Sequence, residues 1–165
     1  MNQLRFLILG GTGFVGKMLV PRLVNRGYKV ILIGRSKTKI NNIFPSIEFT
    51  NYQELEKIIS AEDIVVNLAV INNNQNISIE DFRAINVHFA HRIAAISAAK
   101  GAAHFINISS VHALCENPKS AYAITKKEAM YALQKISNMP VSHLFLPSIY
   151  GDKFSGKLRF LNYCH

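Results

Sequence analysis

The sequence predicts an α/β fold in which helices cover both faces of a doubly wound parallel sheet. Six short apolar runs recur along the 165 residues, and most are separated by segments with the apolar spacing of amphipathic helices. The first run leads directly into a glycine-rich turn, Gly10 to Gly16, and then into a helical pattern. We therefore expect one domain over residues 1–165, built in three layers of helices, sheet and helices.

The first third of the chain predicts a strand-helix-strand unit. Residues 4–9 are nearly all apolar, as expected of a strand that is buried on both faces of a parallel sheet. Residues 15–26 place apolar side chains along one side of a helix that Gly27 ends, although Pro21 removes one of its hydrogen bonds. Residues 30–33 form the second apolar run. A unit of this size is typical of dinucleotide-binding domains.

The turn between the first strand and the first helix reads Gly10-Gly11-Thr12-Gly13-Phe14-Val15-Gly16. Glycine allows the backbone to bend sharply and to approach a ligand, and the start of a helix presents free amide groups to an anion. Glycines also occur in turns that bind nothing, so the position between a strand and a helix is what gives the pattern its meaning. We expect Gly10, Gly13 and Gly16 to contact the diphosphate of a dinucleotide.

The end of the second strand carries Gly34-Arg35-Ser36, where an acidic residue would normally bind the ribose hydroxyls of NAD. The absence of a carboxylate removes repulsion toward a 2′-phosphate, and a guanidinium can bind such a phosphate through two hydrogen bonds. We interpret Arg35 as favouring NADP over NAD. The alternative is that Arg35 is a solvated loop residue.

The remaining apolar patterns complete the predicted sheet. Ala69 is small and lies at the carboxyl end of a buried run, so a cofactor would fit over the sheet edge there. Ser78 and Asp81 have the spacing that caps the start of a long helix. The further strands are predicted at residues 47–49, 63–70, 105–108 and 141–146, and the further helices at 54–59, 78–99 and 119–136.

Three polar side chains are predicted to meet at the carboxyl edge of the sheet. Tyr122 and Lys126 are four residues apart and share one face of a helix, and Ser110 ends the preceding strand. An adjacent ammonium and a cationic nicotinamide would favour the phenolate of Tyr122, which would exchange a proton with a substrate hydroxyl during hydride transfer. Lys126 would also hold ribose hydroxyls, and Ser110 would bond the reacting oxygen. The alternative is a chance pair, with a packed tyrosine and a solvated lysine.

The composition argues against several other classes of protein. The formal net charge is +9, but the basic residues are scattered apart from residues 35–39 and 126–127, without the aromatic interleaving of a nucleic-acid site. We expect no nucleic-acid partner. No apolar run approaches the roughly 20 residues that cross a bilayer, so we expect a cytoplasmic protein without a membrane partner. Cys115 and Cys164 have no metal-binding spacing and are expected to be free thiols, and His88 and His91 lack a nearby third ligand, so we expect no metal.

Taken together, the motifs resemble those of the short-chain dehydrogenase/reductase superfamily. Within it they are most similar to the extended or atypical branch, the NAD(P)-dependent epimerase/dehydratase family of nucleotide-sugar enzymes. The matching segments follow the family's order over nearly the whole chain: Gly10 to Gly16, Asp63 to Ala69, Asn86-Val87, Phe105 to Ser110, Tyr122 to Lys126, and Pro147 to Gly151.

The resemblance implies a Rossmann-type fold and an enzyme that binds a nicotinamide dinucleotide and acts on a carbonyl or hydroxyl carbon of a sugar nucleotide or similar metabolite. It implies that Ser110, Tyr122 and Lys126 are catalytic, and that the tyrosine and lysine also contact the cofactor. The other residues it assigns to the cofactor are Gly10, Thr12, Gly13, Phe14, Val15 and Gly16 around the phosphates, Leu68 and Ala69 at its middle, Asn86 as a supporting polar position, and Pro147 at the nicotinamide end.

The sequence also departs from the family pattern. Asn67 stands where the family often has histidine, and the interval between Ser110 and Tyr122 is short for a sugar epimerase. The family continues into a substrate-binding lobe, whereas this sequence stops at His165, so we expect most of the C-terminal substrate lobe to be missing. Self-association or a completing partner chain would then be needed to grip a substrate. Two alternatives stay open: a module that binds a dinucleotide without turnover and serves as a redox sensor or an assembly partner, and a truncated remnant that folds poorly.

Overall fold

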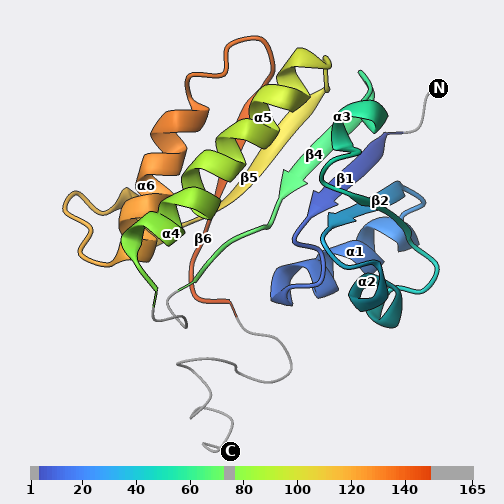
Figure 1. Ribbon diagram of the computed structural model, residues 1–165, viewed down its shortest axis with the longest axis horizontal. Helices are drawn as coiled ribbons and strands as arrows, with labels where there is room; N and C mark the ends of the chain where they lie inside the picture. The colour runs from blue at the N-terminus through green and yellow to red at the C-terminus, as the bar shows by residue number, and fades with distance from the viewer. Residues whose placement is uncertain (1–3, 73–76, 150–165) are drawn as a thin grey trace, which may run out of the picture.

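The computed structural model describes residues 4–72 and 77–149, and Figure 1 shows their arrangement. The strands are β1 (Arg5–Leu9), β2 (Lys29–Gly34), β3 (Glu48–Asn51), β4 (Asp63–Asn67), β5 (His104–Ser110) and β6 (Val141–Leu146). The helices are α1 (Phe14–Asn25), α2 (Lys37–Ile43), α3 (Leu55–Ile58), α4 (Ile79–Arg83), the π-helix η1 (Ala84–Phe89), α5 (Ala90–Ala99), the 3₁₀ helix η2 (Val111–Leu114) and α6 (Ala121–Leu133).

Within the described residues, six parallel strands form one sheet in the order β3-β2-β1-β4-β5-β6. The chain starts in the centre of the sheet with β1, runs outward to β3, and then returns to the other side of β1 with β4. Ligands of such sheets bind where the strand order reverses, at the carboxyl ends of the strands. The order therefore places the expected binding site between the ends of β1 and β4.

Two apolar cores fill the spaces between the sheet and its helices. Successive strand residues point to opposite faces, so Leu7 packs in the core that contains α3, α5 and α6, whereas Ile8 packs in the core that contains α1 and α2. Figure 1 shows α1 and α2 beside β1 and β2, and α4 to α6 together beside β4 and β5. Burial of both faces explains why the strands are continuous apolar runs.

A buried ion pair joins the amino ends of the two central strands. Asp63 is fully buried at the start of β4 and is the register partner of Arg5 in β1. The Arg5 Nε atom lies 2.6 Å from one carboxylate oxygen of Asp63, and the second oxygen accepts from the Ser60 backbone amide at 2.7 Å. The carboxylate is thus fully paired in a place where an unpaired charge would be costly.

The structure confirms the doubly wound α/β fold of Rossmann type in three layers. It differs in detail from the expected elements. The strand expected over residues 63–70 ends at Asn67, because the Asn67 side chain accepts from the Ala69 backbone amide at 3.2 Å and takes it out of the strand pattern. The Ser78–Asp81 capping box is present, but the helix expected over residues 78–99 is interrupted by the π-helix η1.

Candidate active site

The glycine turn makes the closest backbone contact in the candidate site. Gly10 has φ of 74°, and a Cβ atom there would lie 2.6 Å from the backbone nitrogen of Ala69. At Gly16 a Cβ atom would lie 2.1 Å from the Gly11 carbonyl oxygen. Gly13 is the N-cap of α1 and brings no side chain that could cap the helix, and the first turn contains no acidic residue. The first amide groups of α1 are therefore available to an anion.

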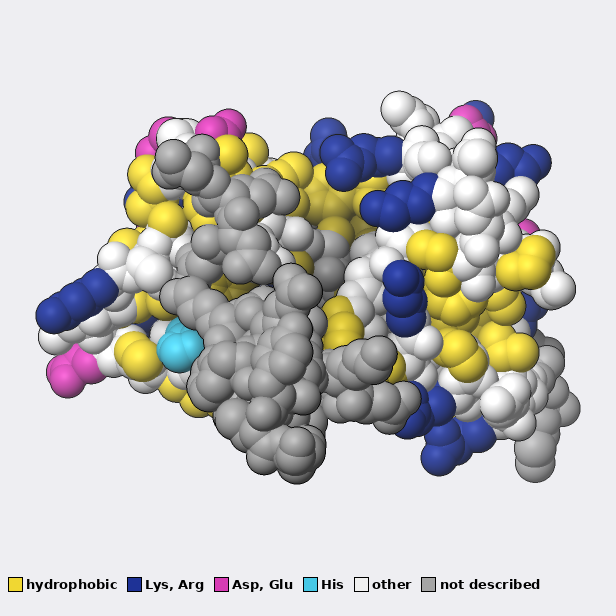
Figure 2. All heavy atoms as spheres, turned by 90° about the horizontal axis from the view of Figure 1, so that it is seen from below, with side chains coloured by type: hydrophobic (Ala, Val, Ile, Leu, Met, Phe, Trp, Pro, Cys, Tyr) yellow, Lys and Arg dark blue, Asp and Glu magenta, His cyan; other side chains and the backbone are white. Residues whose placement is uncertain are grey.

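A cleft of about 1150 Å³ opens at the carboxyl ends of the strands, and both halves of the sheet contribute to it. Figure 2 looks onto this edge of the molecule, and most of its Lys and Arg side chains gather on the half that holds α1 and α2. The residues assigned from the sequence that line the cleft are Gly10, Thr12, Gly13, Phe14, Val15, Gly16, Arg35, Leu68, Ala69, Ser110, Tyr122, Lys126 and Pro147.

The cleft is basic where the second strand ends. Arg35 lines it together with Ser36 and Lys39, and the Ser36 hydroxyl caps α2 by accepting from the Lys39 backbone amide at 3.2 Å. Tyr52 lines the cleft on β3's side, where burial raises the pKa of its phenol and the charge of Arg35 acts in the opposite direction. Lys39 was not among the residues predicted for the site, although it belongs to the basic cluster at residues 35–39.

Lys126 is a buried lysine in the wall of the cleft. Its side chain lies under β5, where Nζ donates to the Ile108 carbonyl oxygen at 2.7 Å, and the residue is only 5% exposed. Burial lowers its pKa to about 8. The solvated lysine of the alternative interpretation is therefore not what the structure shows.

Tyr122 lies beside Lys126 on α6, with the ammonium nitrogen 6.0 Å from the centre of the phenol ring. The largest effect on the phenol is burial, which raises its pKa, and a hydrogen bond with Ser110 acts in the opposite direction. Ser110 itself caps η2, since its hydroxyl accepts from the His112 backbone amide at 3.3 Å. The sequence-based expectation of a lowered tyrosine pKa is thus not met by the protein groups alone, and any phenolate would need further positive charge in the cleft.

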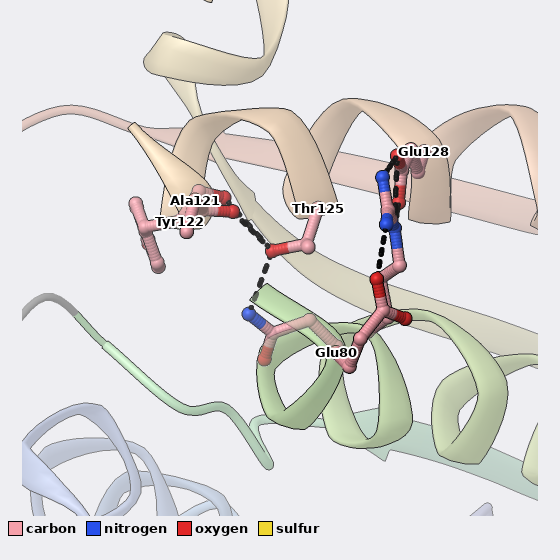
Figure 3. A network of polar contacts seen from close by, with 7 residues as sticks. Glu80, Ala121, Tyr122, Thr125 and Glu128 are labelled. Carbon is pink, nitrogen blue, oxygen red and sulfur yellow. Dashed lines mark hydrogen bonds and ion pairs between the residues drawn. The ribbon is translucent and has the colours of Figure 1, made fainter. Parts of the chain in front are cut away.

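Asn86 does not line the cleft but is buried behind it, and its predicted part as a supporting polar position stays a prediction. Its side chain is buried in η1, where Oδ1 accepts from the Ile71 amide at 2.9 Å and Nδ2 donates to the Ile71 carbonyl at 3.1 Å. Nδ2 also donates to the Thr125 hydroxyl at 3.1 Å, and Thr125 donates to the Ala121 carbonyl at 2.8 Å (Figure 3). Asn86 therefore ties the loop after β4 to the helix that carries Tyr122 and Lys126.

An ion pair also joins α4 to α6. The Arg83 guanidinium donates through Nε and Nη2 to the Glu128 carboxylate, at 3.0 and 2.8 Å, and through Nη1 to Glu80 at 2.7 Å (Figure 3). A bidentate arginine pair restricts orientation as well as distance. The position of α6, and of its two site residues, is thus determined from two sides.

The described residues include only some of the cysteines and motif residues named from the sequence. Cys115 is an exposed free thiol, whereas Tyr150, Gly151 and Cys164 lie outside the described residues. Over residues 4–72 and 77–149, no three His, Cys, Asp or Glu side chains come together as a metal site would require. Over the same residues, no helix has the length and hydrophobicity needed to cross a membrane.

The structure is that of an α/β protein of Rossmann type with a cleft at the carboxyl ends of its parallel strands. The chain belongs to the NAD dependent epimerase/dehydratase family, whose model matches residues 6–157. It is similar in structure to the Bordetella bronchiseptica enzyme WbmG in complex with NAD (TM-score 0.79, 19% identity, covering 96% of this chain and 58% of that one). It is also similar to UDP-N-acetylglucosamine 4-epimerase from Bacillus cereus (TM-score 0.78, 18% identity, 96% and 66% covered).

The chain is also similar in sequence to a curated relative whose name is that of a subunit. The mitochondrial NADH dehydrogenase [ubiquinone] 1 alpha subcomplex subunit 9 of Dictyostelium discoideum is 30% identical over 123 residues, which cover 67% of this chain and 33% of that protein. This chain therefore spans about a third of that relative's length and between half and two thirds of the two solved structures.

The contact between Gly10 and the Ala69 backbone predicts a large cost for a side chain at position 10. We expect Gly10→Ala to lower the free energy of unfolding by roughly 3 kcal/mol, because the methyl group displaces backbone that cannot move away. Gly101→Ala is the matched control, since Gly101 has the same φ of 74° but no atom within 4 Å of the added Cβ. It should cost only about 1 kcal/mol in urea unfolding. Equal losses for the two variants would contradict the close contact.

The burial of Lys126 predicts that stability rises with pH. Because the pKa of this lysine is about 8 in the folded chain against 10.5 for the free side chain, the unfolded chain binds more protons between these values. The free energy of unfolding should therefore increase from pH 8 toward pH 10, by about 3 kcal/mol at most. Lys126→Met should remove this increase, whereas the exposed Lys135→Met should keep it. A wild-type stability that is flat over this range would count against the assignment.

Proposed function

We propose that the chain carries the cofactor site and the catalytic side chains of an NAD(P)-dependent enzyme that acts on a carbonyl or hydroxyl carbon. The observation that supports this most is that the glycine turn, Ser110, Tyr122 and Lys126 line one cleft. These residues come from opposite halves of the sheet, so their meeting is not a consequence of local sequence. The family membership supports an NAD-dependent, epimerase-like role.

The described residues fit a dinucleotide. Its diphosphate would lie against the first turn of α1, where the amide groups are uncapped and no acidic side chain opposes it. The cleft has the volume of a site for a large ligand, since typical small-molecule sites hold about 300 to 1,000 Å³. The adenosine end would lie toward Arg35 and the nicotinamide end toward Pro147, because these two residues line opposite parts of the sheet order.

The chemistry follows from the three polar side chains. The bound nicotinamide would supply or accept the hydride. Ser110 would hold the reacting oxygen by its hydroxyl, and Tyr122 would give or take the proton at the same oxygen. Lys126 uses one N–H on Ile108 and has further donors for ribose hydroxyls. Because its pKa is about 8, an anionic ligand nearby would keep more of it charged, and that charge would favour the phenolate of Tyr122.

We infer that the substrate is a sugar nucleotide or a similar metabolite, supported by the likeness to a UDP-N-acetylglucosamine 4-epimerase. Epimerisation, dehydration and reduction would all use the same tyrosine and lysine, so these two residues do not distinguish the three reactions.

A second candidate is a dinucleotide-binding module without turnover that serves as an assembly partner. The observation in its favour is the Dictyostelium relative, whose name is that of a subunit. In such a protein the glycine turn and Lys126 would still hold the cofactor. The difference would lie in Tyr122, whose phenol would remain protonated as its burial favours.

Tyr122→Phe distinguishes the two candidates. We expect this variant to keep dinucleotide binding within about twofold and to lose turnover of sugar-nucleotide substrates by about 10² to 10⁴, because the proton donor is removed while the ring remains. The exposed Tyr131→Phe on the same helix should change neither quantity. Calorimetry measures binding, and chromatographic separation of substrate from product measures turnover, since epimerisation and dehydration leave no net change in the nicotinamide. Binding without any Tyr122-dependent turnover would favour the module, and no binding would defeat both candidates.

Arg35→Ala tests the proposed preference for NADP. Because a guanidinium pairs with the 2′-phosphate, the variant should weaken NADPH binding by about tenfold and NADH binding by less than about twofold. Lys37→Ala is the control, since this exposed lysine is absent from the cleft lining. Fluorescence titration with both dinucleotides gives the two dissociation constants. Equal losses for NADPH and NADH would show that Arg35 does not read the 2′ position.

A further inference from the structure

Three polar side chains stand side by side on adjacent strands beneath the cleft. Asn67 of β4 is the register partner of Asn107 in β5, and Asn107 is the register partner of His143 in β6. The two asparagines are 2% and 1% exposed, respectively. They occupy the sheet face that packs against α5 and α6, since Val65 and Phe105, two residues earlier in the same strands, belong to that core. Buried polar side chains in such a place need hydrogen-bond partners.

The hydrogen bonds among these side chains run in one direction. The Ala69 backbone amide donates to Asn67 Oδ1 at 3.2 Å, and a backbone N–H can only donate. This fixes the orientation of the Asn67 amide, whose Nδ2 donates to Asn107 Oδ1 at 3.0 Å. The Nδ2 atom of Asn107 is then left facing His143 Nδ1, at 3.4 Å.

The direction of this ladder determines the form of the histidine. Because Asn107 presents N–H groups, His143 Nδ1 has to accept, so the ring is neutral and carries its proton on Nε2. Nε2 is buried and has no hydrogen-bond partner among the residues that the structure describes. A second proton on Nδ1 would set donor against donor and would place a cation beside a buried, unsatisfied N–H.

The other end of the ladder reaches the cofactor cleft. Ala69 and Leu68 line the cleft, and their backbone lies directly against Gly10, where a Cβ atom would be 2.6 Å from the Ala69 nitrogen. The Ala69 amide, as the first donor of the ladder, is therefore part of the surface that supports the glycine turn.

We propose that Asn67, Asn107 and His143 form a one-directional hydrogen-bonded ladder that holds the Leu68–Ala69 backbone in place for the dinucleotide and requires a neutral His143. His143 is then a positioning residue: it touches no ligand, and its protonation weakens binding by releasing the far end of the ladder. This inference rests on the proposed dinucleotide site, but the state of the ladder itself does not depend on a ligand.

The surroundings of His143 agree with a neutral ring. Burial and the charge of Lys126 on α6 both lower its pKa. Besides Lys126, α6 carries the titratable groups Tyr122, Lys127, Glu128 and Tyr131, while η2 carries His112 and β5 carries His104. His104 is bonded to Ser142 at 2.8 Å, and both lie on the sheet face opposite the ladder. The transition is therefore expected below pH 6.5, the ordinary value for histidine.

The binding test uses NAD, which has no 2′-phosphate to titrate in this range. Wild-type affinity measured by calorimetry should fall by about fivefold between pH 7.5 and pH 5, the size of one lost hydrogen bond. His143→Gln keeps an acceptor that does not titrate, so this fall should disappear. His143→Leu removes the acceptor and should bind about fivefold more weakly at both pH values. The exposed His88→Gln should behave as wild type. A fall that persists unchanged in His143→Gln overturns the proposal.

A second measurement separates this inference from the proposed function. In the chain without ligand, nitrogen chemical shifts should show the proton of His143 on Nε2 at pH 7.5. On acidification, the Asn107 side-chain amide and the Ala69 backbone amide should shift with the same midpoint as the ring. A proton on Nδ1, or an Ala69 amide that does not follow the ring, overturns the ladder whether or not NAD binds. A ladder that titrates as expected in a chain that does not bind NAD would instead defeat the proposed function.

Discussion

The contact on which the rest of the structure depends is the one between Gly10 and the backbone of Leu68 and Ala69, where a side chain of any size would collide. It joins the end of β1 to the end of β4, the two strands between which the chain reverses its direction of travel across the sheet. The start of α1 and the floor of the cleft are brought together by this contact. The contact can form only because residue 10 has no Cβ atom.

The polar groups behind the cleft are arranged to maintain that contact rather than to meet a ligand. Asn86 holds Ile71 by both its amide and its carbonyl, and the Asn67 side chain holds Ala69 from within the sheet. Lys126 is held by a carbonyl of β5 in surroundings that disfavour its charge. The protein therefore accepts an electrostatic cost at this lysine, a pattern more typical of functional sites than of structural ones.

The sequence predicts what depends on local pattern. Continuous apolar runs, glycine spacing and capping residues indicated the strands, the turn at Gly10 and the Ser78 cap, and the fold class is confirmed. The meeting of Ser110, Tyr122 and Lys126 at one cleft followed from where parallel strands end. The bonds that Asn86 makes to Ile71 and Thr125, and the ladder from Asn67 to His143, depend on side-chain direction and on register between strands far apart in sequence. A single sequence carries no signal for these contacts, and the roles of the site residues stay predictions.

The π-helix η1 sets the rotation of α5 relative to α4. A turn that closes its hydrogen bonds one residue later than an α-helix is equivalent to an α-helix with one residue inserted. The faces of α4 and α5 are therefore out of phase by about 100° relative to a continuous helix. Loss of a single residue between Ala84 and Phe89 would make the helix regular and would turn Asn86 by about 100° relative to α4 or to α5, depending on the side of Asn86 from which the residue is lost. The irregular turn therefore lets Arg83 on α4 reach Glu128 while Asn86 bonds Ile71 and Thr125.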